Sequence, residues 1–198
     1  MVSPTNRSPN TPEWRAVQAI YRTPPVDPQR LVEAVAYAAS FYPAKLAHDP
    51  SIQTWLQVLL EWPEGEGATV AIELNARAER EVVQRGQTSF YTSFARSAAP
   101  RVALKGLDHD RTVRVRDFLH ELMAASFDYL VERDLNAYLG TQSFSNASAL
   151  LVFRSAVHVI VKQAPMPVYN HGQPNNVELE RLLEAAWLAL AVPILPRS

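Results

Sequence analysis

The sequence predicts a mainly α protein, a single compact domain of about six to eight helices, with a short strand or hairpin near residues 68–75 as the one β element. Three observations lead to this prediction. Apolar residues make up 47% of the 198 residues, which is enough to bury a core. They recur every three or four positions in most segments, as in amphipathic helices. Prolines are absent between residues 101 and 164, so long helices fit the middle of the chain.

The first part of the chain carries three signals for the start of a helix. Each is a residue with a side-chain oxygen followed by a proline. The oxygen accepts a hydrogen bond from a free backbone N–H of the first turn, where proline has no N–H to leave unsatisfied. The signals are Thr11-Pro12, Asp27-Pro28 and Asp49-Pro50, and they predict helices over about 12–22, 28–40 and 50–62.

The pattern of residues 68–85 is ambiguous. Val70, Ile72 and Leu74 alternate with other residues, as in a strand, whereas Val70, Leu74 and Val82 have helical spacing. Gly86 is placed to end such a helix. We predict a helix over about 68–85 and keep a short strand at its start as the alternative.

The clearest elements lie in the second half of the chain. A broad apolar stripe predicts a helix over about 110–138, some 42 Å long, closed by Gly140. A segment that ends near residue 163, capped by Ser143 or Ser145, is apolar on nearly every face, so we expect a helix that is central in the fold. Its β-branched run, Val157, Val159, Ile160 and Val161, leaves a strand as the alternative. Asn175 and Glu178 resemble a capping box, which predicts a last helix to about residue 192.

The ends of the chain differ from this helical domain, which we place at residues 12–192. Residues 1–11 are polar and lack the apolar region of a signal peptide, so we expect a flexible arm. Residues 193–198 form a short apolar tail. No apolar stretch reaches the roughly 20 residues of a membrane span. We therefore expect no membrane association and a cytoplasmic location.

Motifs that carry known chemistry are missing. The chain has no cysteine, which excludes disulfides, thiol nucleophiles and cysteine-zinc sites. It has no glycine-rich phosphate loop and no Gly-x-Ser-x-Gly motif. His48 and His109 each precede an aspartate at a helix start, and His109 lies about 16 Å from His120 along one helix, too far to share a metal. We predict no metal site and no cofactor, and we assign no catalytic residue.

Charge is balanced overall but not along the chain. The net charge is -1, yet residues 96–116 carry six basic and two acidic side chains, and residues 61–81 carry six glutamates and two arginines. A basic segment of this kind can bind nucleic acid or another anion, and the aromatic residues 90, 91 and 94 could stack on bases. The alternative is a solvated face that pairs internally with the acidic segment. The candidate contacts are Arg101, Lys105, Arg111, Arg114 and Arg116.

Arg154 and His158 form a second candidate site. They are four residues apart on an otherwise apolar segment, so on a helix they face the same way. A buried arginine needs a partner, for which Asp128, Glu132 and Glu184 are candidates. The pair indicates a polar pocket for an anion, or else a structural ion pair or a face directed toward solvent or a subunit.

Two apolar features outside the predicted helices suggest contact with a partner. Tyr169 lies in a proline-stiffened loop, where an aromatic side chain can dock a partner or pack on the chain's own core. Ile194 and Leu195 lie between two prolines in the tail. Each large aliphatic side chain forfeits about 1.5–3 kcal/mol if it is left in water, so we expect these two to be buried against the chain's own core or against a partner.

These features favour a non-enzymatic helical interaction or scaffold subunit of a larger assembly, with a protein partner or a second copy bound. The first alternative is a nucleic-acid-associated accessory subunit of a nucleoprotein complex that uses the basic segment 96–116. The second is a small enzyme or ligand-binding protein with a pocket around Arg154 and His158.

Overall fold

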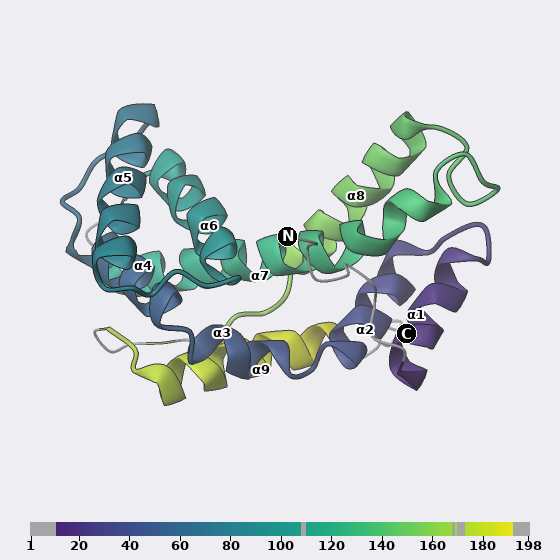
Figure 1. Ribbon diagram of the computed structural model, residues 1–198, viewed down its shortest axis with the longest axis horizontal. Helices are drawn as coiled ribbons and strands as arrows, with labels where there is room; N and C mark the ends of the chain where they lie inside the picture. The colour runs from purple at the N-terminus through teal and green to yellow at the C-terminus, as the bar shows by residue number, and fades with distance from the viewer. Residues whose placement is uncertain (1–10, 108–109, 168, 170–172, 192–198) are drawn as a thin grey trace, which may run out of the picture. The chain divides into compact units, whose positions relative to one another are not determined.

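The computed structural model describes residues 11–107, 110–167, 169 and 173–191. Within these residues the protein is mainly α, as predicted, with nine α-helices, one short 3-10 helix and no β-strand (Figure 1). The helices are α1 (Pro12–Tyr21), α2 (Pro28–Ala38), α3 (Tyr42–Ala47), α4 (Pro50–Glu61), α5 (Ala68–Gln84), α6 (Thr92–Lys105), α7 (Arg111–Leu135), the 3-10 helix η1 (Asn136–Tyr138), α8 (Ala147–Lys162) and α9 (Asn176–Ala191).

The described residues form two compact units. The first unit draws its residues from 1–40, 126–165 and 187–198, and the second from 41–125 and 166–186. Residues 111–125 of α7 therefore belong to the second unit and the rest of that helix to the first.

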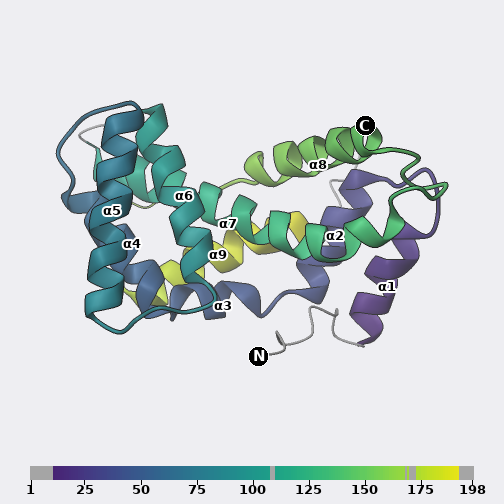
Figure 2. The ribbon, with the colours of Figure 1, turned by 45° about the horizontal axis from the view of Figure 1, so that its top comes forward.

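In the first unit, α2 packs against both α1 and α8 (Figure 2). Its core contains the fully buried Tyr21 and Phe127 and the nearly buried Trp187. The indole N–H of Trp187 donates a hydrogen bond of 2.9 Å to the carbonyl of Ala36, and its ring lies 4.6 Å from that of Phe127. One buried tryptophan thus joins the end of α9 to α2 and α7.

In the second unit, α4, α5 and α6 pack against one another, and the figures show α5 and α6 side by side (Figures 1 and 2). Small side chains on α6, namely Ala95, Ala98, Ala99 and Ala103, are buried and allow a close approach. Trp55 on α4 is the largest fully buried side chain of this unit.

The predicted caps are confirmed. Thr11, Asp27 and Asp49 each accept a hydrogen bond from a backbone N–H of the turn that follows, and a proline occupies the first helical position. Asn175 and Glu178 form the reciprocal capping box: the Asn175 N–H donates to Glu178 Oε2 at 2.9 Å, and the Glu178 N–H donates to Asn175 Oδ1 at 3.0 Å.

Residues 68–84 form a helix from the start, so the strand alternative is wrong. Gly86, with a φ of 64°, follows the end of α5. The N–H of Gln87 donates to the carbonyl of Val82 and that of Gly86 to the carbonyl of Val83, the pattern of a Schellman cap. The left-handed backbone at Gly86 favours glycine.

Two helices were not predicted, α3 and α6. Pro100 lies inside α6, where it removes one backbone hydrogen bond and normally breaks a helix. The buried alanines of α6, which have high helix propensity and pack on α5, outweigh that cost. α3 is six residues long with Pro43 in its first turn, too short for its periodicity to show.

The segment that ends near residue 163 differs from its prediction in two respects. Its N-cap is Asn146, whose side chain accepts from the N–H of Ala149 at 2.9 Å, and not Ser143 or Ser145. Its helix, α8, is also not central, because several of its large apolar side chains are exposed.

Candidate interaction surface

One side of α8 belongs to the core of the first unit. Leu150, Phe153, Val157 and Val161 are buried and recur every three or four residues, so they form one stripe along the helix. This stripe accounts for the contact of α8 with its own unit. It uses fewer than half of the apolar residues in the helix.

The opposite side of α8 is exposed, and it carries no charge between residues 148 and 159. It consists of Ser148, Leu151, Val152, Ser155 and Val159, which we call the α8 face. The exposed fractions are 56% for Leu151, 71% for Val152 and 52% for Val159. Lys162, partly buried, follows at the C-terminal end of the same side.

A hollow of about 570 Å³ opens beside the α8 face. Val152 belongs to both, so the apolar surface continues from the face into the hollow. Its wall comes from α8, the segment before α2 and the segment before α8, with Pro24, Pro25, Val26, Phe144, Phe153 and Ala156 among the lining residues.

Two polar contacts line the other flank of the α8 face. Arg154 forms an ion pair with Glu132 of α7, and His158 Nδ1 lies 3.3 Å from Asp128 Oδ2. The Arg154 side chain is 39% exposed and the His158 side chain 27%, so the two residues predicted as a buried polar pair are only partly buried. The contacts join α8 to α7 within the first unit, and Glu184, the third candidate partner, is not used.

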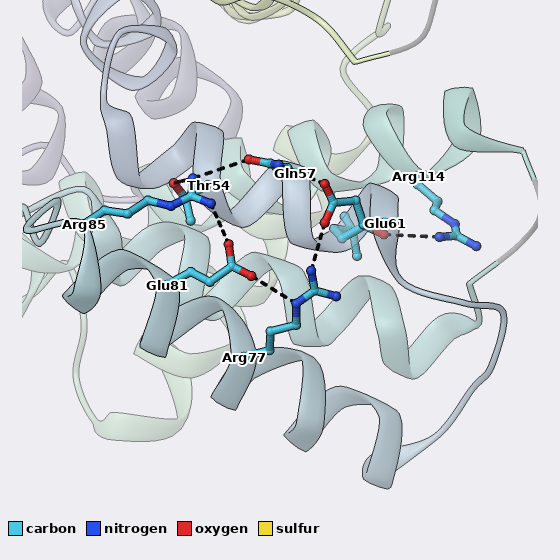
Figure 3. Close-up of polar contacts among 8 residues, drawn as sticks. Thr54, Gln57, Glu61, Arg77, Glu81, Arg85 and Arg114 are labelled. Atoms are coloured by element: carbon cyan, nitrogen blue, oxygen red, sulfur yellow. Dashed lines mark hydrogen bonds and ion pairs between the residues drawn. The ribbon is translucent and has the colours of Figure 1, made fainter.

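Arg114 is the buried member of the basic segment. Only 5% of it is exposed. Its guanidinium donates hydrogen bonds to the carbonyls of Leu59 at 3.2 Å and Trp62 at 2.6 Å, and Figure 3 shows the Arg114 side chain with one of its polar contacts. Leu59 lies in the last turn of α4 and Trp62 is its C-cap, where a helix has no internal donors left for its carbonyls. Arg114 therefore caps the C-terminus of α4, and its prediction as an exposed contact for nucleic acid is wrong.

The other basic candidates are exposed or partly exposed. Arg101 and Lys105 extend from α6 to one carboxylate, that of the fully buried Glu121, at 3.7 and 2.5 Å. Arg116 lies 3.3 Å from the neighbouring Asp117. Arg111 is exposed, and the described part of the chain shows no ion pair for it. The set therefore does not form one continuous patch of unpaired cations.

Two glutamates of the acidic segment, Glu61 and Glu81, pair with arginines of α5. On α5, Arg77 contacts Glu81 at 3.0 Å and Glu61 of α4 at 2.8 Å, and Arg85 contacts Glu81 at 2.8 Å (Figure 3). A hydrogen bond from Gln57, together with the charge of Arg77, lowers the pKa of Glu61. Among the described residues, Glu79 forms an ion pair with Arg96 of the basic segment, which is a pairing of the predicted kind.

Tyr169, a predicted partner contact, is partly buried in the second unit. Burial, followed by the charge and hydrogen bond of Glu178, raises the pKa of its hydroxyl. Ile194 and Leu195, the other predicted contacts, lie outside the described residues, as do most of the predicted arm and the whole tail.

The described residues contain no group of three potential metal ligands among histidine, aspartate and glutamate. None of the helices described is both long and apolar enough to cross a membrane.

Comparison of the sequence and structure with known protein families, curated proteins and solved structures finds no match.

The α8 face was missed at the level of the sequence, although a signal was present. When only the number of apolar residues in the segment is considered, α8 is expected to be apolar on every side. On a helical projection, Ser148, Ser155 and Lys162 fall on the side opposite the buried stripe, together with Val152 and Val159. Serines and a terminal lysine among valines indicate a surface that is exposed in the free chain.

Proposed function

We propose that this chain is a non-enzymatic helical interaction subunit that binds a protein partner through the α8 face. The observation that carries the proposal is the exposure of Leu151, Val152 and Val159 together on one helix side. Exposing a large aliphatic side chain forfeits about 1.5–3 kcal/mol relative to burying it. A partner that covers all three side chains would recover part of that free energy.

The exposed apolar residues of α5 do not have this arrangement. Ile72 and Val83 on α5 are each 67% exposed, but the charged Glu73 and Arg80 stand between them on the same exposed surface. Single apolar side chains among charges are normal on a protein surface. The α8 face is distinguished by the absence of any charge between its apolar members.

The surroundings of the α8 face resemble those of known interfaces. Protein interfaces have an apolar centre, depleted of charge, with a polar rim. Here the hollow extends the apolar surface on one flank, and the contacts of Arg154 and His158 supply polar groups on the other.

The proposal is tested by capture of proteins from a lysate of the source organism with the tagged full-length chain. Val152→Glu places a carboxylate in the centre of the face, and Ile72→Glu makes the same change at a similarly exposed helix position. We expect partners that are retained by the wild type and by Ile72→Glu but lost with Val152→Glu. Retention by all three proteins would contradict the proposal.

Nuclease treatment of the lysate distinguishes the proposal from the first alternative, a nucleic-acid-associated subunit that uses the basic segment. A partner retained through the basic segment by way of nucleic acid would disappear after the treatment and at higher salt, because phosphate contacts weaken steeply with ionic strength. A partner on the α8 face should survive both.

A further inference from the structure

We infer that the α8 face binds a second copy of this chain, with the two α8 helices antiparallel about a two-fold axis at Ser155. The inference rests on the proposed function, since it names the partner for the same surface. It starts from the order of residues along the exposed side of α8.

The most outward positions of α8 follow a regular spacing. Ser148, Val152, Ser155, Val159 and Lys162 are separated by four, three, four and three residues. This alternation keeps one seam of a helix facing a second helix over its whole length. The seam runs from Ser148 to Lys162 and so covers 15 of the 16 residues of α8.

The seam is nearly symmetric about its centre. Ser148 and Lys162 lie seven residues to either side of Ser155, while Val152 lies three residues before it and Val159 four after it. In a two-fold interface, if residue i contacts residue j of the copy, then j contacts i. An axis at Ser155 therefore places each Val152 within one residue of Val159 of the copy, close enough for the two valines to pack on each other, and both valine pairs are buried by a single operation.

The charges favour the antiparallel direction. Lys162 is the one charged residue of the seam. In a parallel pair, Lys162 would face Lys162 of the copy, and like charges in contact oppose association. In the antiparallel pair, Lys162 faces the neutral Ser148 of the copy.

The flank of the seam does not oppose a second copy either. Arg154 pairs with Glu132, and Asp128 lies beside His158. Counted with Lys162 of the seam, each copy brings two positive and two negative side chains to the contact. A surface without net charge can meet an identical surface without repulsion.

Ser155 suits the position on the axis. It is exposed and small, which allows the two helices to approach closely. Its hydroxyl is both a donor and an acceptor, so the two serines can hydrogen-bond to each other across the axis. No buried polar group is then left without a partner.

The test begins with sedimentation of the full chain over a concentration series. We expect a monomer–dimer equilibrium. Val152→Glu or Val159→Glu enters the interface twice, and we expect either to raise the dissociation constant about 100-fold. Ile72→Glu is the matched control and should leave the constant unchanged. A wild-type monomer throughout, or a dimer insensitive to both valine variants, would overturn the inference.

Cross-linking tests the direction of the helices. Because the chain has no cysteine, a single introduced thiol can be oxidised only to the thiol of a second copy. Ser155→Cys on the axis should form a disulfide-linked dimer under mild oxidation. Ser148→Cys lies about 10 Å along the helix from the axis, so its two thiols are beyond the reach of a disulfide. Efficient cross-linking of both variants would indicate a parallel pair and refute the arrangement.

Failure of this inference is distinguishable from failure of the proposed function. A chain that stays monomeric but loses a captured protein with Val152→Glu retains the proposed function with another partner, and the second copy is then ruled out. A chain that neither self-associates nor captures a protein through the α8 face refutes both.

Discussion

Substitution of Arg114 by alanine should destabilise the second unit strongly, because this arginine caps the C-terminus of α4. Its guanidinium is buried and donates to the carbonyls of Leu59 and Trp62. A hydrogen bond that involves a charged group contributes about 1.5–3 kcal/mol, and two give about 3–6 kcal/mol. The favourable position of a cation at a helix C-terminus is part of the same interaction and is not added. Water that enters the vacated space recovers some of the loss, so we expect about 3–4 kcal/mol.

Urea unfolding followed by circular dichroism measures this loss as a shift of the midpoint at an unchanged slope. Arg116→Ala is the matched control two residues away. Its side chain is half-exposed and contacts only the adjacent Asp117 among the ion pairs described, so we expect a change below about 0.5 kcal/mol. Arg114→Lys keeps the charge but loses the planar donor group, and its stability should fall between the two. Equal stability of Arg114→Ala and Arg116→Ala would refute the capping role.

Three further predictions concern other polar contacts. Lys105→Ala takes the nearest cation from the fully buried Glu121 and should cost about 3 kcal/mol in urea unfolding; a loss below about 1 kcal/mol would contradict this role. Arg154→Ala breaks a half-exposed ion pair and should cost less than about 1 kcal/mol, so a loss above about 2 kcal/mol would mean that the pair is more buried than described. Burial raises the pKa of the Tyr21 hydroxyl above its unfolded value of about 10. The neutral hydroxyl therefore contributes fully to the free energy of unfolding below about pH 10, and this contribution is lost as the pH rises further. Tyr21→Phe gives up the hydrogen bond to the Val131 carbonyl, about 1 kcal/mol at neutral pH, and should flatten the fall of the urea midpoint above pH 10; an unchanged alkaline fall would contradict this.

The helix starts were predictable because their causes are local. Asp27 and Asp49 bond to N–H groups two and three residues ahead, and the capping box of Asn175 and Glu178 lies within one turn. The sequence contains both partners of each interaction at a fixed spacing. The start of α8 was harder to predict, since several polar residues precede the helix and the N-cap is Asn146 rather than Ser143 or Ser145.

α6 was not predictable in the same way, because its stability comes from packing. Pro100 is a local signal against a helix. The contacts that outweigh it are made by buried alanines such as Ala95 and Ala99 against helices that begin more than 20 residues earlier. A pattern within one segment does not contain that information.

The basic candidates show a similar limit. Arg114 and Arg116 are two residues apart and identical in type, yet one is buried and the other exposed. The two arginines differ because the C-terminal end of α4 lies beside Arg114. The carbonyls that Arg114 binds there belong to residues 52 and 55 positions before it in the chain. A count of charges predicts a field, but it does not predict which charges are already satisfied by the fold.

The basic segment and the α8 face differ in how far their side chains already have partners within the chain. Most cations of the basic segment have partners within the chain: Arg114 on the carbonyls of α4, and Arg101 and Lys105 on Glu121. Binding of a phosphate backbone would have to compete with these contacts. The apolar side chains of the α8 face have no such cover within the first unit as described, since Val152 is 71% exposed, and binding there costs no existing interaction. The free energy available from a new contact is therefore greater at α8 than at the basic segment, and this difference supports a protein partner over nucleic acid.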